Sequence, residues 1–375
     1  MKRPRLDAIE YIRGISMLGV IGIHIGSQYL INPTPNLHLV ALLEIVTRFS
    51  VPIFFFISAF GLFYNMDMNK PFTMADYKEF LIRRGKTVMI PYIVWSMFYM
   101  LHNGLLFQYL SYLTPGGILS NLVFGNGSYQ LYFMVLLLWF YLFMPLWIIM
   151  VKWCTPERLV LLAVIQIAIN YALDILINPY YMEPSILKTL LTYRLNYWII
   201  YYFFIFVLGG WLAVNFETFQ QIMKDYRRTI IISFWTTMIA LLGYYYKIVL
   251  INELPPLAGV FTAHQLCPIG VLYTIAASLF FFTIFTEWRL PGSIRSCLSL
   301  LGKHSYFAYL AHPIAITYCM LCLERMNIVM SAGPTAALYI AVVLMTMLMA
   351  AGCRRLGEIV PAINKLTIGI YPRKK

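Results

Sequence analysis

Charged residues are scarce in this sequence. Only 11% of its 375 residues are Asp, Glu, Lys or Arg, and 61% are hydrophobic, whereas soluble proteins carry about 25% charged residues. A water-soluble globular protein is therefore excluded, and we expect an all-α integral membrane protein. We expect no cleavable signal peptide, because the first apolar stretch is too long and further apolar stretches follow it.

Several motifs of common enzymes are also missing. The sequence has no glycine-rich nucleotide loop, no H-E-x-x-H metal site and no G-x-S-x-G nucleophile elbow. Six cysteines are present, mostly in or beside apolar segments, and the C-x-x-C of Cys319 and Cys322 has no second pair. We interpret the cysteines as packing residues and expect neither a metal nor a tightly bound cofactor.

Apolar runs recur along the chain and alternate with short polar breaks. Most of the 28 Lys and Arg residues fall in every second break, so the positive-inside rule places those breaks and both termini in the cytoplasm. This placement explains the net charge of +13 without nucleic acid as a partner. The pattern predicts a single membrane domain over residues 1–375, without an appended soluble domain, built as a bundle of about ten transmembrane helices at residues 10–31, 39–64, 88–108, 130–151, 158–178, 197–215, 229–250, 267–286, 300–322 and 335–353.

Arg13 and His24 are the most informative pair of residues. Eleven residues of helix make about three full turns, so both side chains should project from one face. Their separation of about 16 Å along the axis puts a cation near one membrane surface and an imidazole near the middle. Ionisable groups at such depths are costly and usually functional. The alternatives are that Arg13 extends to the headgroups and that His24 is bonded to a neighbouring helix.

Three further polar residues fall within predicted spans. Glu44 and Arg48 are four residues apart and predict an ion pair, which is either a structural clamp or part of a reactive site. A carboxylate beside His24 would favour a general base, but the sequence leaves open whether Glu44 reaches that histidine. His312 precedes Pro313 and either joins the same polar core or bonds to backbone that the proline frees.

The strongest basic cluster directly precedes the third predicted span and contains Arg83, Arg84 and Lys86. Such clusters anchor a helix at the cytoplasmic membrane surface. Alternatively, they hold the phosphates of a cytosolic ligand, since arginine binds phosphate in a bidentate manner.

Arg13 and His24 have ten residues between them and Glu10 before them. Further motifs follow along the chain: FFFISAF (54–60), which includes Ser58, RRGKTVMIPYIVW (83–95), YQLYFMVLLLWFYLFMPL (129–146), YFFIFVLGG (202–210) and LGKHSYFAYLAHP (301–313). Taken in this order, these segments resemble the acyltransferase-3 family of bacterial integral membrane acyltransferases. The chain departs from the family pattern at Ala59, Gln130, Tyr132 and Lys86.

The resemblance implies transfer of an acyl group, often acetyl, from cytosolic acyl-CoA to a hydroxyl of an envelope or exported glycan at the bacterial cytoplasmic membrane. The expected partners are acyl-CoA, a carbohydrate acceptor, the lipid bilayer and glycan synthesis or export proteins. The expected catalytic residues are His24, as the general base, with Glu44 and Arg48. Those expected to bind the donor are Arg13, Arg83, Arg84 and Lys86, and further candidates for the polar core are Glu10, Ser58 and His312.

Two other functions compete with this one. A transporter or flippase for a lipid-linked saccharide or another anion would use Glu44, Arg48, Asp174 and His312 along its path, but the inverted repeat of many transporters is not seen. A non-catalytic scaffold or sensor gives no reason for the stripe formed by Arg13 and His24.

Overall fold

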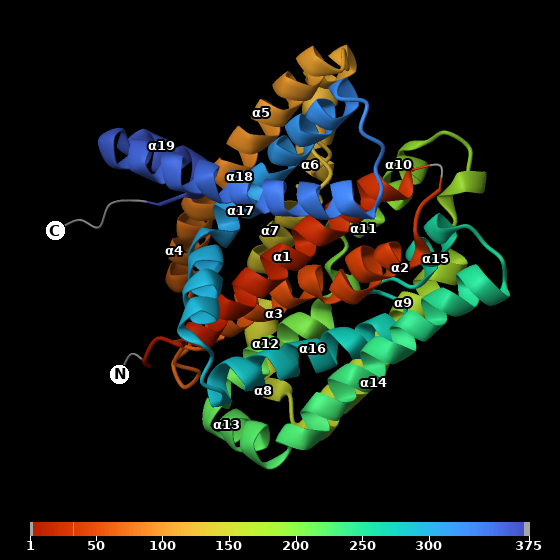
Figure 1. The fold of residues 1–375 in the computed structure, drawn as a ribbon. Coiled ribbons are helices and arrows are strands. Elements are labelled where there is room, and N and C mark those ends of the chain that lie inside the picture. Colours follow the sequence, from red (N-terminus) through yellow and green to blue (C-terminus); the bar gives the residue numbers. More distant parts are fainter. Residues whose placement is uncertain (1–2, 33, 371–375) are drawn as a thin grey trace.

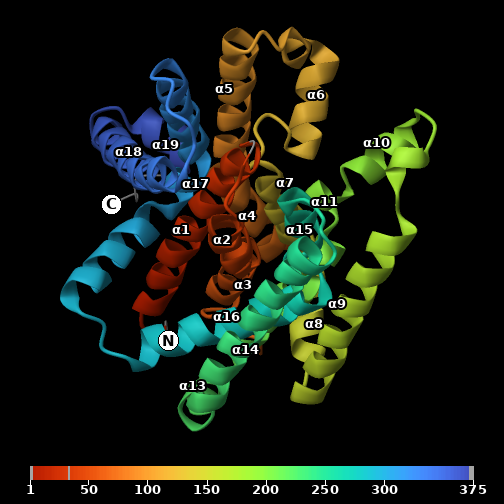
Figure 2. The ribbon, with the colours of Figure 1, turned by 45° about the vertical axis from the view of Figure 1, so that its right-hand side comes forward.

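A computed structural model describes residues 3–32 and 34–370, and in this part of the chain all regular structure is helical (Figures 1 and 2). Short helices are α2 (Leu37–Val40), α10 (Ile186–Thr192), α11 (Arg194–Tyr197) and α15 (Pro256–Thr262). The longer helices are α1 (Asp7–Leu30), α3 (Ser50–Phe63), α4 (Met74–Arg84), α5 (Ile90–Leu106), α6 (Pro115–Phe124), α7 (Tyr132–Leu142), α8 (Met144–Trp153), α9 (Pro156–Leu176), α12 (Phe203–Val214), α13 (Phe216–Asp225), α14 (Arg227–Tyr246), α16 (Pro268–Glu287), α17 (Gly292–Arg325), α18 (Ala332–Ile359) and α19 (Pro361–Ile368).

Irregular helical turns join several of these helices. The π-helical turns are Ala41–Ile45, Gly85–Met89 and Lys247–Ile251, and the 3₁₀ turns are Val46–Phe49, Leu110–Leu113, Pro179–Tyr181 and Ile199–Tyr201. The second predicted span therefore consists of α2, a π turn, a 3₁₀ turn and α3 in direct succession.

The expectation of a multi-pass helical membrane protein is confirmed, but the number of spans is not. Within the described residues, seven helical segments are long and apolar enough to cross a membrane, or nine if the bent pairs α7–α8 and α12–α13 each count as one. The remaining predicted span, 88–108, corresponds to α5, which has 17 residues by itself. The π turn Gly85–Met89 precedes it without a break, so ten spans remain a prediction.

The two bends have identifiable causes. α7 and α8 meet at 68°, next to Pro145 near the start of α8, where proline removes a backbone donor. α12 and α13 meet at 98°, and α13 is amphipathic: Phe216, Phe219 and Met223 are buried, while most of its polar residues are exposed. Such a helix suits the membrane surface better than its interior.

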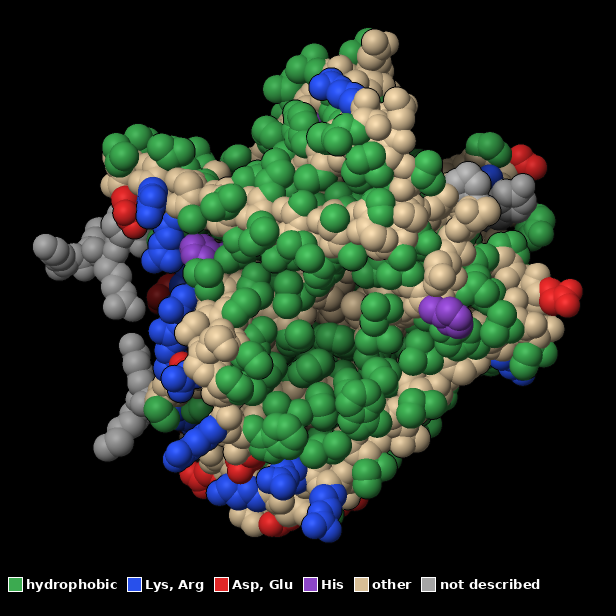
Figure 3. All heavy atoms as spheres, viewed as in Figure 1, with side chains coloured by type: hydrophobic (Ala, Val, Ile, Leu, Met, Phe, Trp, Pro, Cys, Tyr) green, Lys and Arg blue, Asp and Glu red, His purple; other side chains and the backbone are tan. Residues whose placement is uncertain are grey.

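Both ends of the described chain lie on one side of the bundle. The backbone N–H of Arg3 donates to Asn65 Oδ1 at 3.2 Å, and its guanidinium donates to the carbonyl oxygen of Ala213 at 2.6 Å. At the other end, Gly369 packs against Thr87, just after the basic cluster. We call this the basic side. Figure 3 shows Lys and Arg side chains gathered along one edge and hydrophobic side chains across the middle. That this side faces the cytoplasm stays a prediction.

Close packing of α1 against α17 positions the residues near the centre of the bundle. A Cβ atom on Gly302 would lie 2.0 Å from the Glu10 carbonyl oxygen, and one on Gly14 would lie 2.6 Å from the Leu298 carbonyl oxygen. Both positions therefore require glycine for the helices to approach this closely. The two helices run in the same direction from this contact, so residues about ten positions further along each helix also meet.

Candidate active site

His24 and His312 meet ten residues beyond the glycine contact, one from α1 and one from α17. Their imidazole rings are stacked, with centroids 5.2 Å apart and an angle of 25° between the planes. The His24 ring also contacts the ring of Tyr129, with centroids 4.5 Å apart. His24 is partly exposed, whereas His312 is fully buried. The His24 imidazole therefore packs against two other rings.

Only one nitrogen of the His312 side chain has a partner in the described part of the chain. Nδ1 lies 3.0 Å from the carbonyl oxygen of Ala308, one turn earlier in α17. A carbonyl accepts only, so Nδ1 carries the proton and Nε2 is an acceptor. Nε2 is buried without a partner, which costs about 1–3 kcal/mol. Of the two options that the sequence left for His312, the structure places the residue against His24. Its hydrogen bond to backbone goes to Ala308, one residue before the carbonyl that Pro313 leaves without an N–H partner.

Residues around His312 hold the proline-containing part of α17 in place. The hydroxyl of Tyr99 donates to the Leu310 carbonyl oxygen at 2.6 Å, and the hydroxyl of Tyr309 donates to the carbonyl oxygen of Gln130. The Oε1 atom of Gln130 is buried and has no hydrogen-bond partner among the described residues. Two unpaired acceptors, Gln130 Oε1 and His312 Nε2, therefore occur in this neighbourhood, and both suit a ligand that donates hydrogen bonds.

Glu44 and Arg48 form the predicted ion pair, with Arg48 Nη2 3.0 Å from Glu44 Oε2. The Ser27 hydroxyl donates to the other carboxylate oxygen at 2.8 Å, so both oxygens of the buried carboxylate are bonded. The described partners of Glu44 are thus Ser27 and Arg48 rather than His24. Arg48 also donates to the Val260 carbonyl oxygen at 3.3 Å, although its Nε has no acceptor.

The loop before α16 covers the Arg48 side of this pair. Gln265 Oε1 lies 3.5 Å from Arg48 Nη1. In the same loop, burial and the neighbouring charge of Arg48 lower the pKa of His264 to about 4, and its Nδ1 accepts from the backbone N–H of Leu266 at 3.0 Å. The positive charge of Arg48 is therefore balanced by Glu44 and faces a histidine that stays neutral at physiological pH.

A cavity of about 240 Å³ lies between the basic side and the two histidines. Arg13 and Arg84 both line it, together with Ser58, and Tyr309 lines it as well. The Tyr309 ring centroid is 6.1 Å from that of His312. Arg13, which was predicted to share a face of α1 with His24, thus lines a cavity. Only the side chain of Tyr309 lies between this cavity and His312.

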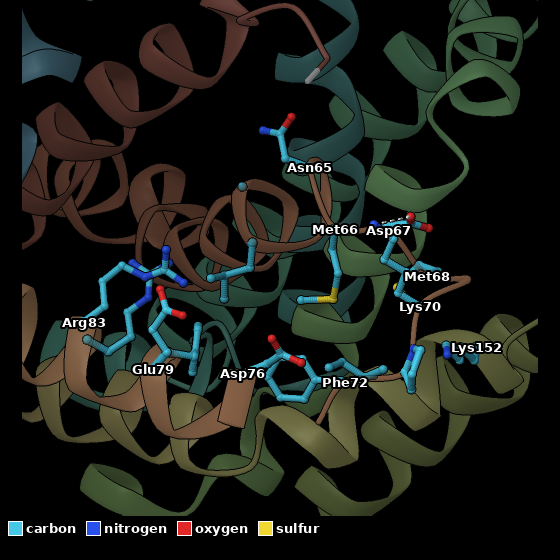
Figure 4. Close-up of a pocket in the computed structure, with 16 residues that line it drawn as sticks. Asn65, Met66, Asp67, Met68, Lys70, Phe72, Asp76, Glu79, Arg83 and Lys152 are labelled. Atoms are coloured by element: carbon cyan, nitrogen blue, oxygen red, sulfur yellow. Dashed lines mark ion pairs between the residues drawn. The ribbon is translucent and has the colours of Figure 1, made fainter. Parts of the chain in front are cut away.

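Arg84 separates this cavity from a wider basin of about 470 Å³ on the basic side, because it lines both. Its guanidinium lies over the Tyr141 ring at 5.0 Å and over the Phe80 ring at 5.3 Å. Figure 4 shows the basin with Arg83 at one end and Lys152 at the other. Arg84 is therefore held by aromatic rings at the junction of the basin and the cavity.

Acidic residues share the basin with these cations. Figure 4 labels Asp67, Asp76 and Glu79 among the side chains that line it. The Lys70 ammonium pairs with Asp67 at 3.9 Å. Hydrogen bonds from Thr73 lower the pKa of Asp76, so this carboxylate stays ionised. The basin is thus mixed in charge, and its cations without an ion pair to any described residue are Arg83, Arg84 and Lys152.

Two predicted site residues lie away from these spaces. Lys86 is exposed and lines neither the basin nor the cavity. Glu10 pairs with Arg5 and accepts from the Ser299 hydroxyl at 3.2 Å, and it lines neither the basin nor the cavity. The structure therefore brings together Arg13, Ser58 and Arg84, and separately His24 and His312. It places Glu44 with Arg48 and leaves Lys86 and Glu10 outside both groups.

Sequence reasoning assigned no role to the aromatic residues of this site. Tyr129 contacts His24, Tyr309 separates the cavity from His312, and Tyr141 holds Arg84. Tyr129 is 47% exposed although it lies beside a deep histidine, so it borders an open space. All three tyrosines fall inside segments that carried the family resemblance, and this was the only sequence signal for a role in the site. The signal was not decisive, because tyrosines are also common at membrane interfaces.

The acyltransferase-3 family, described as an acyltransferase domain, matches residues 6–371. The match covers nearly the whole chain, and the chain belongs to this family. No curated protein and no solved structure matches it. The chain is therefore a membrane acyltransferase in general terms.

Proposed function

We propose that this chain transfers an acyl group, acetyl first among the candidates, from acyl-CoA to a hydroxyl of an envelope or exported glycan at the bacterial cytoplasmic membrane. One observation carries the proposal. A cavity lined by Arg13 and Arg84 extends from the basic side to Tyr309, which packs against the stacked pair of His24 and His312.

The two connected spaces suit the shape and charge of acyl-CoA. A polyanionic nucleotide cannot enter hydrocarbon, so its phosphates stay in the basin with Arg83 and Lys152. The thin pantetheine arm passes Arg84 and enters the narrower cavity beside Arg13. The thioester is then directed towards Tyr309, and a side-chain movement of Tyr309 completes the route to His24.

In the proposed reaction, the oxygen of the acceptor hydroxyl attacks the thioester carbonyl carbon while His24 takes the hydroxyl proton. The carbon–sulfur bond breaks, the thiolate of CoA leaves, and His24 returns the proton to that sulfur. The protonated His24 lies against the Tyr129 ring, and an aromatic ring of this kind attracts a cation. The unpaired Nε2 of His312 accepts a hydrogen bond from a second hydroxyl of the carbohydrate.

Arg48 has a supporting role in this proposal. Arg48 is held in place by Glu44 and by backbone of the loop before α16. A fixed positive charge near the reacting carbonyl stabilises the developing oxyanion. Glu44 then serves to position Arg48 instead of bonding to the base.

The test compares envelope glycans by mass spectrometry in cells with and without this chain, and measures free CoA released by the purified protein with acetyl-CoA and the glycan. We expect an acyl mass on the glycan only when the chain is present, and CoA release that depends on the acceptor. A transporter or flippase would change the amount of glycan outside the membrane without changing its mass and without releasing CoA.

A further inference from the structure

A second cavity with basic residues lies at the start of α1 and α17. Its volume is about 460 Å³, and it is formed by the start of α1 and the first three turns of α17. It shares no lining residue with the Arg13 cavity or with the basin. Figure 2 shows the cyan start of α17 beside the red start of α1. This cavity is therefore a separate space on the same side of the protein.

The charged residues of this cavity divide into a paired and an unpaired set. Arg5 pairs with Glu10, which also accepts from Ser299. In contrast, the side chains of Arg295, Lys303 and Asp7 form no ion pair and no hydrogen bond among the described residues, although all three line the cavity. Two unpaired cations and one unpaired carboxylate thus face one space.

We expect the first turns of α17 to lie at the depth of the lipid headgroups. The helix has 34 residues, which correspond to about 51 Å, whereas the hydrocarbon core of a bilayer is about 30 Å thick, so α17 is longer than one crossing requires. Its first turns carry Arg295 and Lys303, which line the cavity, and charged side chains are costly inside the hydrocarbon. Leu300, also in the lining, is 52% exposed and offers apolar surface beside the charged groups.

From this arrangement we propose that the cavity binds the headgroup of a phospholipid that carries a phosphate and a primary ammonium, as phosphatidylethanolamine does. Arg295 and Lys303 hold the phosphate, and Asp7 holds the ammonium. Arginine and lysine near a membrane surface commonly bind phosphate in this way. A purely anionic headgroup would leave Asp7 unpaired beside a negative ligand, and a choline headgroup lacks the N–H donors that a carboxylate accepts.

The test uses the full-length, delipidated protein and native mass spectrometry with phosphatidylethanolamine, phosphatidylglycerol, phosphatidylcholine or diacylglycerol of the same acyl chains. We expect the wild type to bind phosphatidylethanolamine most tightly. The double variant Arg295→Ala, Lys303→Ala should bind it at least about tenfold more weakly, because two charge-assisted contacts are lost. Asp7→Asn should lower the affinity for phosphatidylethanolamine to that for phosphatidylglycerol.

A matched control removes two cations elsewhere. Arg227 and Arg228 are exposed at the start of α14 and line none of the three spaces, so Arg227→Ala, Arg228→Ala should leave lipid binding unchanged. The proposal is overturned if both double variants lose binding equally, or if the wild type binds diacylglycerol or phosphatidylcholine as tightly as phosphatidylethanolamine. Displacement of the lipid by inorganic phosphate alone would instead assign the cavity to a soluble anion.

This site does not depend on the proposed acyl transfer. Lipid binding is measured without donor or acceptor, and neither Arg295 nor Lys303 belongs to the route to His24. Failure of acyl transfer would leave the lipid result intact, and failure of lipid binding would leave the transfer assay intact. The comparison of lipids on the wild type also remains decisive if a variant does not fold.

Discussion

Two groups of polar side chains lie deep in the helical bundle, and they differ in how completely they are bonded. In the first, both carboxylate oxygens of Glu44 are bonded, by Arg48 and Ser27. In the second, His24 and His312 are stacked, and His312 Nε2 has no partner within the described residues. In a bonded buried pair each charge compensates the other, so that removing one partner is costly. A buried acceptor without a partner lowers stability. A ligand that donates a hydrogen bond to it would explain why the protein has such a group.

The largest effect should come from His24. We expect His24→Ala to lower acyl transfer by about 100- to 10,000-fold, the usual contribution of a general base, while the protein still reaches the membrane folded. CoA release by the purified variant measures the loss, and its elution as a monodisperse species controls for folding. Undiminished transfer would remove the proposed base and leave the histidine pair without a catalytic explanation.

The ion pair should affect stability most. Glu44→Ala leaves Arg48 buried without its partner and should lower the free energy of unfolding by about 3–5 kcal/mol. The double variant Glu44→Gln, Arg48→Met removes both charges and should recover most of that loss in a thermal unfolding assay. If the double variant is as unstable as the single one, the loss does not come from an uncompensated charge on Arg48.

Two cations that were predicted to bind the donor, Arg13 and Lys86, should differ in their effect on the KM for acyl-CoA. Arg13 lines the cavity, and Lys86 lines neither space, so Arg13→Ala should raise the KM for acyl-CoA by at least about tenfold, the effect of losing one charge-assisted contact. Lys86→Ala, the matched control, should change it little. The KM for the acceptor should move less than that for the donor in Arg13→Ala. Equal shifts for both substrates would argue against a role in donor binding.

A variant of His312 tests most directly whether the stacked histidines serve function, unlike the ion pair of Glu44 and Arg48. His312→Phe keeps an aromatic ring against His24 but removes both the unpaired Nε2 and the hydrogen bond from Nδ1 to Ala308. These two effects have opposite signs, so stability should change by no more than about 1 kcal/mol. Transfer should nevertheless fall about tenfold, because the nitrogen that accepts from the carbohydrate is lost. A drop in stability together with full activity would show that His312 is a structural residue.

The sequence predicts some of these contacts and not others, for physical reasons. The shared face of Arg13 and His24 and the pair of Glu44 and Arg48 follow from helical spacing over 11 and four residues. The stacking of His24 on His312 depends on how closely α1 approaches α17, and this is set by glycines at two distant positions. No spacing along the chain encodes such a contact.

Loops and irregular turns limit prediction in a second way. Arg48 follows a π turn and lies in a 3₁₀ turn, so a regular period of 3.6 residues does not give its direction reliably. Its contacts with Val260 and Gln265 come from a segment more than 200 residues away. For Lys86, in contrast, the sequence suggested a role that the structure does not support. Its place in a basic cluster predicted donor binding, but the side chain is exposed and does not line the basin.

The smallest expected effect concerns pH and the loop that covers Arg48. Burial and the charge of Arg48 lower the pKa of His264 to about 4, whereas the unfolded chain has a value of about 6.5. Between these values the unfolded state binds more protons, so stability should fall as the pH falls through this window and should be fully present above it. Because His264 is partly exposed, we expect a loss of only about 1 kcal/mol. His264→Gln should flatten the pH dependence of the thermal midpoint in this range, and an unchanged slope would place the acid sensitivity in another group.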